Sequence, residues 1–465
     1  MNANRFRQIW STKKNFFSTN KLRPAQTASQ AEADVDILSK QDAQVSQISS
    51  GITVASVENY SPITRISAVV KAGSRYETPQ NTGIVHLLRH CAVLSTKNHT
   101  AFALTRNLEM MGAKLNVTST RDNLIYNLKC SRDNIDDALA ILADVVSNPT
   151  FKPWEVEEAS HMLPTDLALH QSRPESVLFE ALHKAAFRGG LANSLYSETF
   201  MIGKHNSEML HNFVHSHFTP SKTAVVGLGI SHEDLEKSVG GLVHLHGGSP
   251  DSDGASKFAP GEIRIEADLP LVYTAVVAEG ASAAKRKMHE FFGVLQNILA
   301  GNHIDDVQNI QLLVKLLKDP TKTLFWLYLL NEYQVSGLNV NYSDTGLFGA
   351  YIVGQPQDMK SLVKAVVTQM KEVTKNITDS AVENAKHKLK AKLLLEADTS
   401  DGAIAAMALD ASMHGKVRDD KELERAINEL KLADIKAIAG KVMKAKPAMA
   451  SLGRLHHTPH VDELL

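Results

Sequence analysis

The chain has 465 residues, of which 43% are hydrophobic and 22% are charged, and its formal net charge is −1. This composition is typical of a globular protein with roughly two to four domains, and the balanced charge gives no indication of nucleic acid as a partner. The two cysteines, Cys91 and Cys130, argue against a disulfide framework and favour a reducing compartment. No run reaches the roughly 18 to 20 apolar residues that span a bilayer, so we expect a protein that is soluble or peripheral to a membrane.

The N-terminal segment differs in composition from the rest of the chain. Residues 1–31 contain six basic residues and no acidic one, and the first acid is Glu32. Aromatic and hydroxyl side chains interleave with these charges, without the continuous apolar run of a secretory signal. Because this pattern is typical of mitochondrial targeting, we predict that residues 1–35 form a transit peptide and flexible leader. A disordered basic tail is the alternative.

Hydrophobic periodicity predicts the elements of the first half. Residues 52–57 and 64–70 are expected to form two strands joined by a turn that contains a proline. A helix is expected to follow, with Asn81 or Thr82 as its N-cap. The next expected elements are a β-hairpin at 114–118 and 124–129 and an amphipathic helix at 133–146.

A second set of elements repeats this order. The breaker-rich segment 247–260 predicts a linker. After it we expect strands at 261–265 and 271–277, a helix at 289–299, a strand at 346–353 and a helix at 359–367. We therefore predict an α+β protein built by internal duplication, with an N-terminal domain at 45–246 and a C-terminal domain at 261–465.

One pentapeptide, His86-Leu87-Leu88-Arg89-His90, carries the strongest chemical signal. A helix would place His86 and His90 on one face, where both could bind one metal ion. Zinc peptidases of the H-x-x-E-H type have a glutamate at the position of Arg89, which accepts a proton from metal-bound water. A guanidinium stays protonated and cannot act as that base. The motif therefore predicts a peptidase scaffold without its catalytic residue, and the second half contains no similar pentapeptide.

Asp166 is the candidate for a third ligand, since peptidases of this class take a carboxylate from a later helix. Pro164 is expected to kink the helix that carries it. Two alternatives follow: His86, His90 and Asp166 bind a metal weakly, or they belong to a hydrogen-bonded patch in which Arg89 pairs with Asp166. We favour the ion pair, and we predict neither a catalytic residue nor a metal ligand in this chain.

Four segments carry a resemblance to a known family that extends from about residue 50 to the C-terminus. They are residues 342–349, 191–196, 227–232 and 457–464. The chain resembles the pitrilysin-like (processing peptidase, M16) family and, within it, the core subunits of the mitochondrial cytochrome bc1 complex. The family's zinc positions fall on His86, His90 and Asp166, and the position of its base falls on Arg89.

The resemblance implies two homologous LuxS/M16-type domains in a clamshell arrangement. It also implies a structural and assembly role in ubiquinol–cytochrome c oxidoreductase (complex III), peripheral to the inner membrane on the matrix side, in a dimeric complex. The implied partners are core protein 1, cytochrome b, cytochrome c1 and the Rieske protein, and no cofactor is implied in this subunit.

Two other functions remain possible on the sequence alone. One is the non-catalytic subunit of a mitochondrial processing peptidase, and the other is a weak zinc metalloendopeptidase. One segment, residues 302–336, is longer and more apolar than the resemblance leads us to expect.

Overall fold

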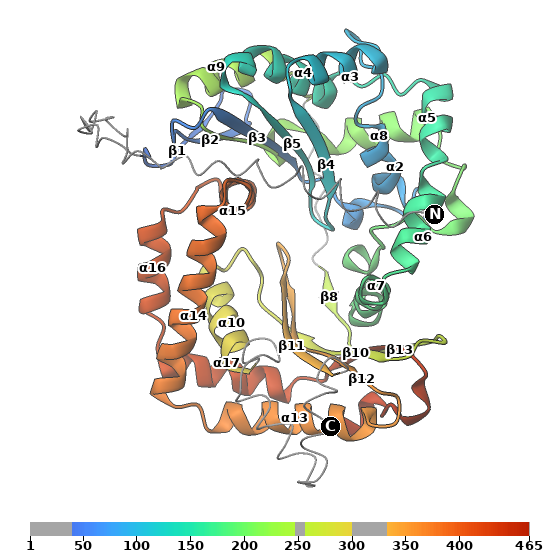
Figure 1. The fold of residues 1–465 in the computed structure, drawn as a ribbon, viewed down its shortest axis with the longest axis vertical. Coiled ribbons are helices and arrows are strands. Elements are labelled where there is room, and N and C mark those ends of the chain that lie inside the picture. Colours follow the sequence, from blue (N-terminus) through green and yellow to red (C-terminus); the bar gives the residue numbers. More distant parts are fainter. Residues whose placement is uncertain (1–39, 247–255, 300–332, 465) are drawn as a thin grey trace, which may run out of the picture. The chain divides into compact units, whose positions relative to one another are not determined.

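The computed structural model describes residues 40–246, 256–299 and 333–464 (Figure 1). The predicted leader, most of the linker and most of the segment 302–336 lie outside these residues. We call residues 40–246 the first half and residues 256–464 the second half. The described residues, from Lys40 onward, form one compact unit. Among the described residues, no helix combines the length and the apolar character needed to cross a membrane.

The first half contains a six-stranded sheet in the order β1-β2-β7-β3-β5-β4. Its strands are β1 Gln44–Gln47, β2 Thr53–Val57, β3 Ile63–Val70, β4 Lys114–Ser119, β5 Leu124–Ser131 and β7 Thr223–Leu228. The hairpin predicted at 114–118 and 124–129 is confirmed as β4 and β5, which pair antiparallel. The first two predicted strands are also confirmed, but they are not neighbours, because β7 lies between them and runs parallel to β2.

The second half contains a five-stranded sheet in the order β11-β12-β10-β13-β9. Its strands are β9 Glu262–Glu266, β10 Val272–Glu279, β11 Gln334–Asn341, β12 Gly346–Gly354 and β13 Ala448–Gly453. The parallel pair β9–β13 corresponds to β2–β7, and the hairpin β11–β12 corresponds to β4–β5. The predicted duplication is therefore visible in the strand order and direction. A small additional sheet pairs β6 Phe187–Arg188 with β8 Lys257–Phe258.

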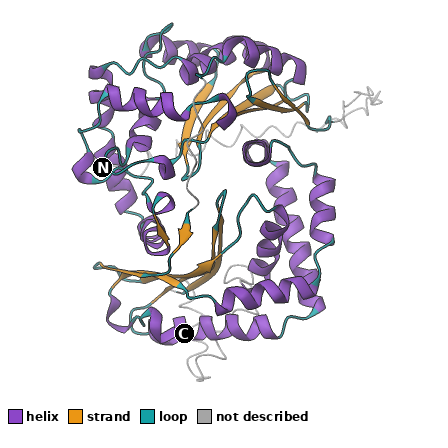
Figure 2. Cartoon of the chain, turned by 180° about the vertical axis from the view of Figure 1, so that it is seen from behind, coloured by secondary structure: helices purple, strands orange, loops and turns teal. Residues whose placement is uncertain are grey.

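Helices surround both sheets (Figure 2). The first half contributes α2 Ile84–Cys91, α3 Ala101–Met110, α4 Ile135–Ser147, α5 Pro153–Ser160, α6 Leu163–Gln171, α7 Pro174–Ala186, α8 Ser207–His217 and α9 His232–Leu242. The second half contributes α10 Arg286–Leu299, α13 Met359–Lys375, α14 Asp379–Asp398, α15 Ser400–His414, α16 Asp420–Asn428 and α17 Leu432–Lys444. Short 3-10 turns are η1 Ser74–Tyr76, η2 Arg132–Asn134, η3 Gly190–Ala192, η4 Thr199–Met201, η5 Pro220–Lys222, η6 Leu455–His457 and η7 Val461–Leu464.

The first sheet is covered on both faces, which explains why nearly every residue of β3 is buried. One face packs under α4 and α9, as Figure 1 shows, through residues such as Ile66 of β3 and Leu142 of α4. The opposite face, which includes Val69 and Val226, packs against Met407 and Ala408. Those two residues lie on α15, a helix of the second half.

The second sheet likewise packs against a helix of the first half, α7. Leu178 and Leu182 of α7 are fully buried, and they pack with Ala450 and Leu452 of β13. The opposite face of this sheet packs under α13. Full burial of a leucine contributes about 1.5–3 kcal/mol, so each half stabilises the other through an exchanged helix. The domain bounds of 45–246 and 261–465 stay predictions. Helix α7 lies within the first of these ranges but packs in the core of the second sheet.

Candidate functional site

The helix that carries both histidines begins differently from the prediction. Gly83 occupies the N-cap with φ of +84°, and neither Asn81 nor Thr82 caps the helix through its side chain. Instead, the Glu77 carboxylate accepts hydrogen bonds from the N–H groups of Gly83 (2.7 Å) and Val85 (3.0 Å). Burial raises the pKa of Glu77 to about 8, although these two N–H donors oppose the shift. The predicted cap was wrong because a more distant carboxylate reaches the same free N–H groups.

His86 and His90 lie on one face of α2, as their spacing predicts. His86 is buried, and the ring centroids are 5.5 Å apart. Asp166 comes from α6, which packs nearby. Pro164 does not kink this helix: α5 ends at Ser160, and Pro164 lies in the first turn of α6, where its missing N–H breaks no hydrogen bond. The expected kink is thus a break between two helices.

The side chains of His86, Arg89 and His90 all contact the same atom, Oδ2 of Asp166. The distances are 3.3 Å from His86 Nε2, 2.5 Å from Arg89 Nη2 and 3.0 Å from His90 Nε2. The predicted ion pair between Arg89 and Asp166 is confirmed. Burial raises the pKa of Asp166, but hydrogen bonds from the histidines and the charge of Arg89 outweigh burial and leave it below its ordinary value.

The protonation of His86 decides what this arrangement can bind. The backbone N–H of Ser197 donates to His86 Nδ1 at 3.1 Å, so the ring proton of the neutral imidazole is on Nε2. Burial and the charge of Arg89 lower the pKa of His86 to about 4, so the ring is neutral near pH 7. Nε2 can then donate to Asp166, but it has no lone pair left for a metal ion.

His86, His90 and Asp166 place their candidate ligand atoms within 4.8 Å of one another. Proximity alone would therefore allow a metal ion. However, a ligating histidine normally donates its other N–H to an acceptor, whereas His86 accepts at Nδ1. Arg89 adds a fixed positive charge against the same carboxylate oxygen. In this arrangement the three residues do not fit a metal ion, and the site contains no base at the position of Arg89.

Ser197, like Glu77, was not predicted from the sequence. It acts through its backbone, so its residue type gives no signal. The neighbouring Tyr196 stacks on His170 at a centroid distance of 4.0 Å and packs edge-on against His86 at 5.4 Å. These contacts fix the loop that presents the Ser197 N–H.

Comparison with known proteins identifies the family. A model described as insulinase (peptidase family M16) matches residues 53–199, and one described as peptidase M16 inactive domain matches residues 204–389. Cytochrome b-c1 complex subunit 2 of human is 36% identical over 91% of this chain and 92% of its own length. The chain belongs to peptidase family M16. The resemblance stated from the motifs is confirmed, as is the duplicated α+β fold.

Other M16 proteins are similar over most of this chain. The mouse cytochrome b-c1 complex subunit 2 is 36% identical over 96% of this chain and 97% of its own length. A probable mitochondrial-processing peptidase subunit alpha-1 of Arabidopsis thaliana is 26% identical over 90% of this chain and 84% of its own length. This M16 chain has a degenerate peptidase motif, with Arg89 between its two histidines.

Proposed function

We propose that this chain is a non-catalytic structural core subunit of mitochondrial ubiquinol–cytochrome c oxidoreductase. The observation that carries the proposal is the 36% identity to the human and mouse complex subunits over more than nine-tenths of each chain. The chemistry of the site supports it, because Arg89 and Asp166 neutralise each other where a peptidase needs a base and a free ligand.

The motif then has a structural role. His86, Arg89 and His90 on α2 all bind Asp166 on α6, so the cluster joins two helices by charge-assisted hydrogen bonds. We infer no catalytic residue, no metal ligand and no cofactor in this chain. Purified protein should contain much less than one zinc per chain after dialysis, whereas a stoichiometric, tightly held zinc would contradict this assignment.

The proposed partners are core protein 1, cytochrome b, cytochrome c1 and the Rieske protein, in a dimeric complex peripheral to the inner membrane on its matrix side. Residues 1–35 would comprise the transit peptide and a flexible leader. Large apolar side chains that stay exposed, such as Phe102, Met110 and Leu395, are candidates for contacts with such partners.

Co-purification tests the proposal. Mitochondria solubilised in mild detergent should yield this chain in one large assembly with cytochromes b and c1 on native electrophoresis. Migration as a small heterodimer free of cytochromes would contradict the proposal. The N-terminus of the mature chain, read by mass spectrometry, should lie after Arg7 and before Ile52; a chain that retains Met1 would contradict the transit peptide.

A processing-peptidase subunit without catalytic activity is the second candidate. The 26% identity to a probable processing-peptidase alpha subunit favours it. It predicts that this chain co-purifies with an active M16 peptidase and that presequence cleavage follows the pair through purification. The higher identity to the b-c1 subunits favours the first proposal.

A further inference from the structure

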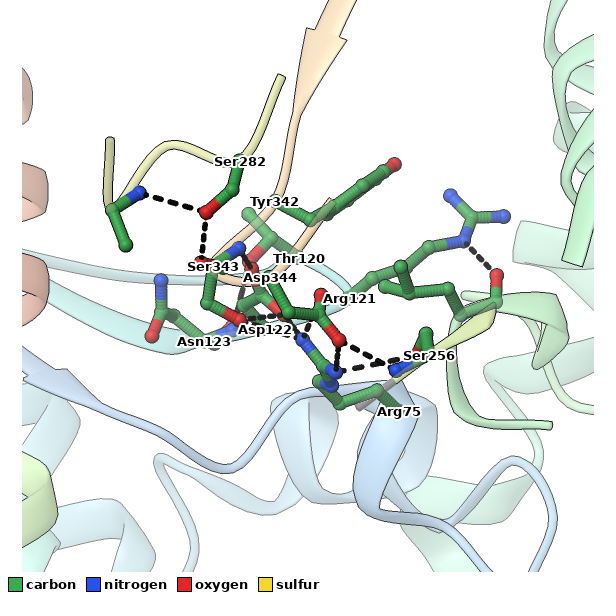
Figure 3. A network of polar contacts seen from close by, with 12 residues as sticks. Arg75, Thr120, Arg121, Asp122, Asn123, Ser256, Ser282, Tyr342, Ser343 and Asp344 are labelled. Atoms are coloured by element: carbon green, nitrogen blue, oxygen red, sulfur yellow. Dashed lines mark hydrogen bonds and ion pairs between the residues drawn. The ribbon is translucent and has the colours of Figure 1, made fainter. Parts of the chain in front are cut away.

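The tips of two equivalent hairpins meet between the halves of this protein. Residues 120–123 join β4 to β5, and residues 342–345 join β11 to β12. Since the two hairpins correspond in the duplicated fold, their tips also correspond. The backbone N–H of Ser343 donates to Asp122 Oδ2 at 2.9 Å, which connects one tip to the other (Figure 3).

One arginine binds both tips. Arg75 lies in η1, the next element after β3. Its guanidinium reaches Asp122 Oδ1 through Nη1 at 2.6 Å and Asp344 Oδ2 through Nη2 at 2.8 Å. Figure 3 shows the guanidinium beside these carboxylates. Both aspartates are the third residue of their tip, so the duplication supplies two equivalent carboxylates to a single cation.

Ser256, at the start of the second half, joins the same cluster. Ser256 donates its backbone N–H to Asp344 Oδ2 at 2.6 Å, and its hydroxyl accepts from Arg75 Nη2 at 3.2 Å. The Ser343 hydroxyl accepts from Arg75 Nη1 at 2.7 Å. One guanidinium therefore holds η1, both hairpin tips and residue 256, which are far apart in the sequence.

Burial gives these contacts their strength. The side chains of Arg75, Asp122 and Asp344 are 5%, 8% and 22% exposed, so water and salt screen them little. The two N–H donors, from Ser256 and Ser343, compensate the second negative charge. Loss of Arg75 would leave two poorly screened carboxylates without a counter-ion, which is strongly unfavourable, whereas loss of the Asp344 carboxylate would leave Arg75 paired with Asp122 alone and remove the ion pair that joins the two halves.

A second ion pair between the halves provides a contrast. Arg65 of β3 binds Asp401 of α15 at 2.7 Å, but Asp401 is 82% exposed. An ion pair with such an exposed partner contributes little, because water competes for both charges. The two pairs have the same chemistry and connect the same halves, and they differ in burial.

We propose that Arg75, Asp122 and Asp344 form a lock that fixes the two halves of this chain in one arrangement. The lock joins the equivalent hairpin tips directly, and Tyr342 extends it, because its hydroxyl lies 2.6 Å from His183 Nε2 on the exchanged helix α7. The halves then behave as one body and do not open relative to each other.

Distance measurements between the halves test the lock. Spin labels would be attached to cysteines introduced at the exposed residues Glu109 of α3 and Lys375 of α13 in the full-length chain, while the buried Cys91 and Cys130 stay unlabelled. Double electron–electron resonance should give one narrow distance distribution. Asp344→Asn should broaden it, and the matched control Asp401→Asn should leave it narrow.

Amide hydrogen exchange supplies a second measurement. Asp344→Asn should accelerate exchange of residues 120–123 and 342–345 by about tenfold, as local opening becomes easier. A narrow distribution with unchanged exchange would overturn the proposal. If Asp344→Asn fails to fold, Ser343→Ala removes one acceptor of Arg75 and keeps both carboxylates. It should accelerate exchange at the same residues, and unchanged exchange there would equally overturn the lock.

Discussion

The backbone N–H of Ser197 donates to Nδ1 of His86 at 3.1 Å, and this one hydrogen bond fixes the chemistry of the degenerate motif. It leaves the ring proton on Nε2, where it points toward Asp166. Arg89 and His90 complete the contacts to the same carboxylate oxygen. One oxygen of Asp166 therefore has three partners from the protein's own side chains.

Restoring the missing glutamate should not restore a peptidase. In Arg89→Glu the new carboxylate would face Asp166, while His86 Nδ1 would still accept from Ser197. We expect no zinc-dependent cleavage of a presequence peptide and a loss of about 1 kcal/mol of stability from the broken ion pair. Urea unfolding and a peptide assay with added zinc measure both effects. Arg106→Glu, at an exposed residue of α3, is the control for charge reversal, and a robust zinc-dependent gain of activity would contradict the assignment.

Acid should destabilise the protein through buried neutral histidines. Burial and the charge of Arg121 lower the pKa of His183 to about 3, so the folded state binds fewer protons than the unfolded state below the ordinary value of 6.5. This stability is present above pH 6.5 and is lost as pH falls toward 3, by up to about 1.4 kcal/mol per pH unit.

Urea titrations at pH 7, 6 and 5 check the sign of this effect. His183→Gln should show a shallower decline in the free energy of unfolding than the parent chain, with the remaining slope due in part to His86. Above pH 7 the two slopes should coincide. Parallel curves between pH 7 and 5 would contradict a neutral His183.

Gly83 should tolerate no side chain. Its φ is +84°, and an added Cβ would lie 2.5 Å from the Cα of Ser197. Gly83→Ala should cost more than the roughly 1–2 kcal/mol of backbone strain, because the Ser197 loop must also move. Gly112→Ala is the matched control: its φ is also positive, at +61°, but nothing lies within 4 Å of an added Cβ. Equal losses of melting temperature in the two variants would contradict the close approach.

The exchanged helix α7 should stabilise the sheet of the opposite half. Leu182→Ala should cost about 2–5 kcal/mol, because it leaves a cavity against β13. Native-state hydrogen exchange should show the largest loss of protection in β13 and β10. Leu210→Ala, in the core of the first half, is the control and should reduce the hydrogen-exchange protection of the first sheet. Loss of protection confined to the first sheet in Leu182→Ala would refute the exchange.

Local patterns predicted the elements well where the relevant contacts are short-range. The strands at 114–118 and 124–129 were predicted together with their pairing, because a short turn leaves antiparallel neighbours little choice. The strands at 52–57 and 64–70 were predicted without their neighbours. Their shared partner β7 arrives from residue 223 onward, and the apolar pattern of a strand does not specify which strand lies beside it.

For the helices and the site, too, local patterns do not specify which distant segments lie in contact. An amphipathic helix reveals an apolar face but not the sheet that covers it, so the exchange of α7 and α15 could not be predicted. Arg89, the two histidines and Asp166 were found because their residue types and spacing carry chemistry. Glu77 and Ser197 were missed because their contacts use backbone groups from other segments.

The sequence by itself determined the duplicated α+β architecture, the histidine pair and the loss of the base, since these follow from periodicity and from the fixed charge of an arginine. Only the tertiary structure decided that His86 carries its proton on Nε2 and that Arg75 joins two equivalent aspartates. Both results depend on distances between segments far apart in the chain. Such distances are set by the packing of the whole fold, and no local pattern in the sequence indicates them.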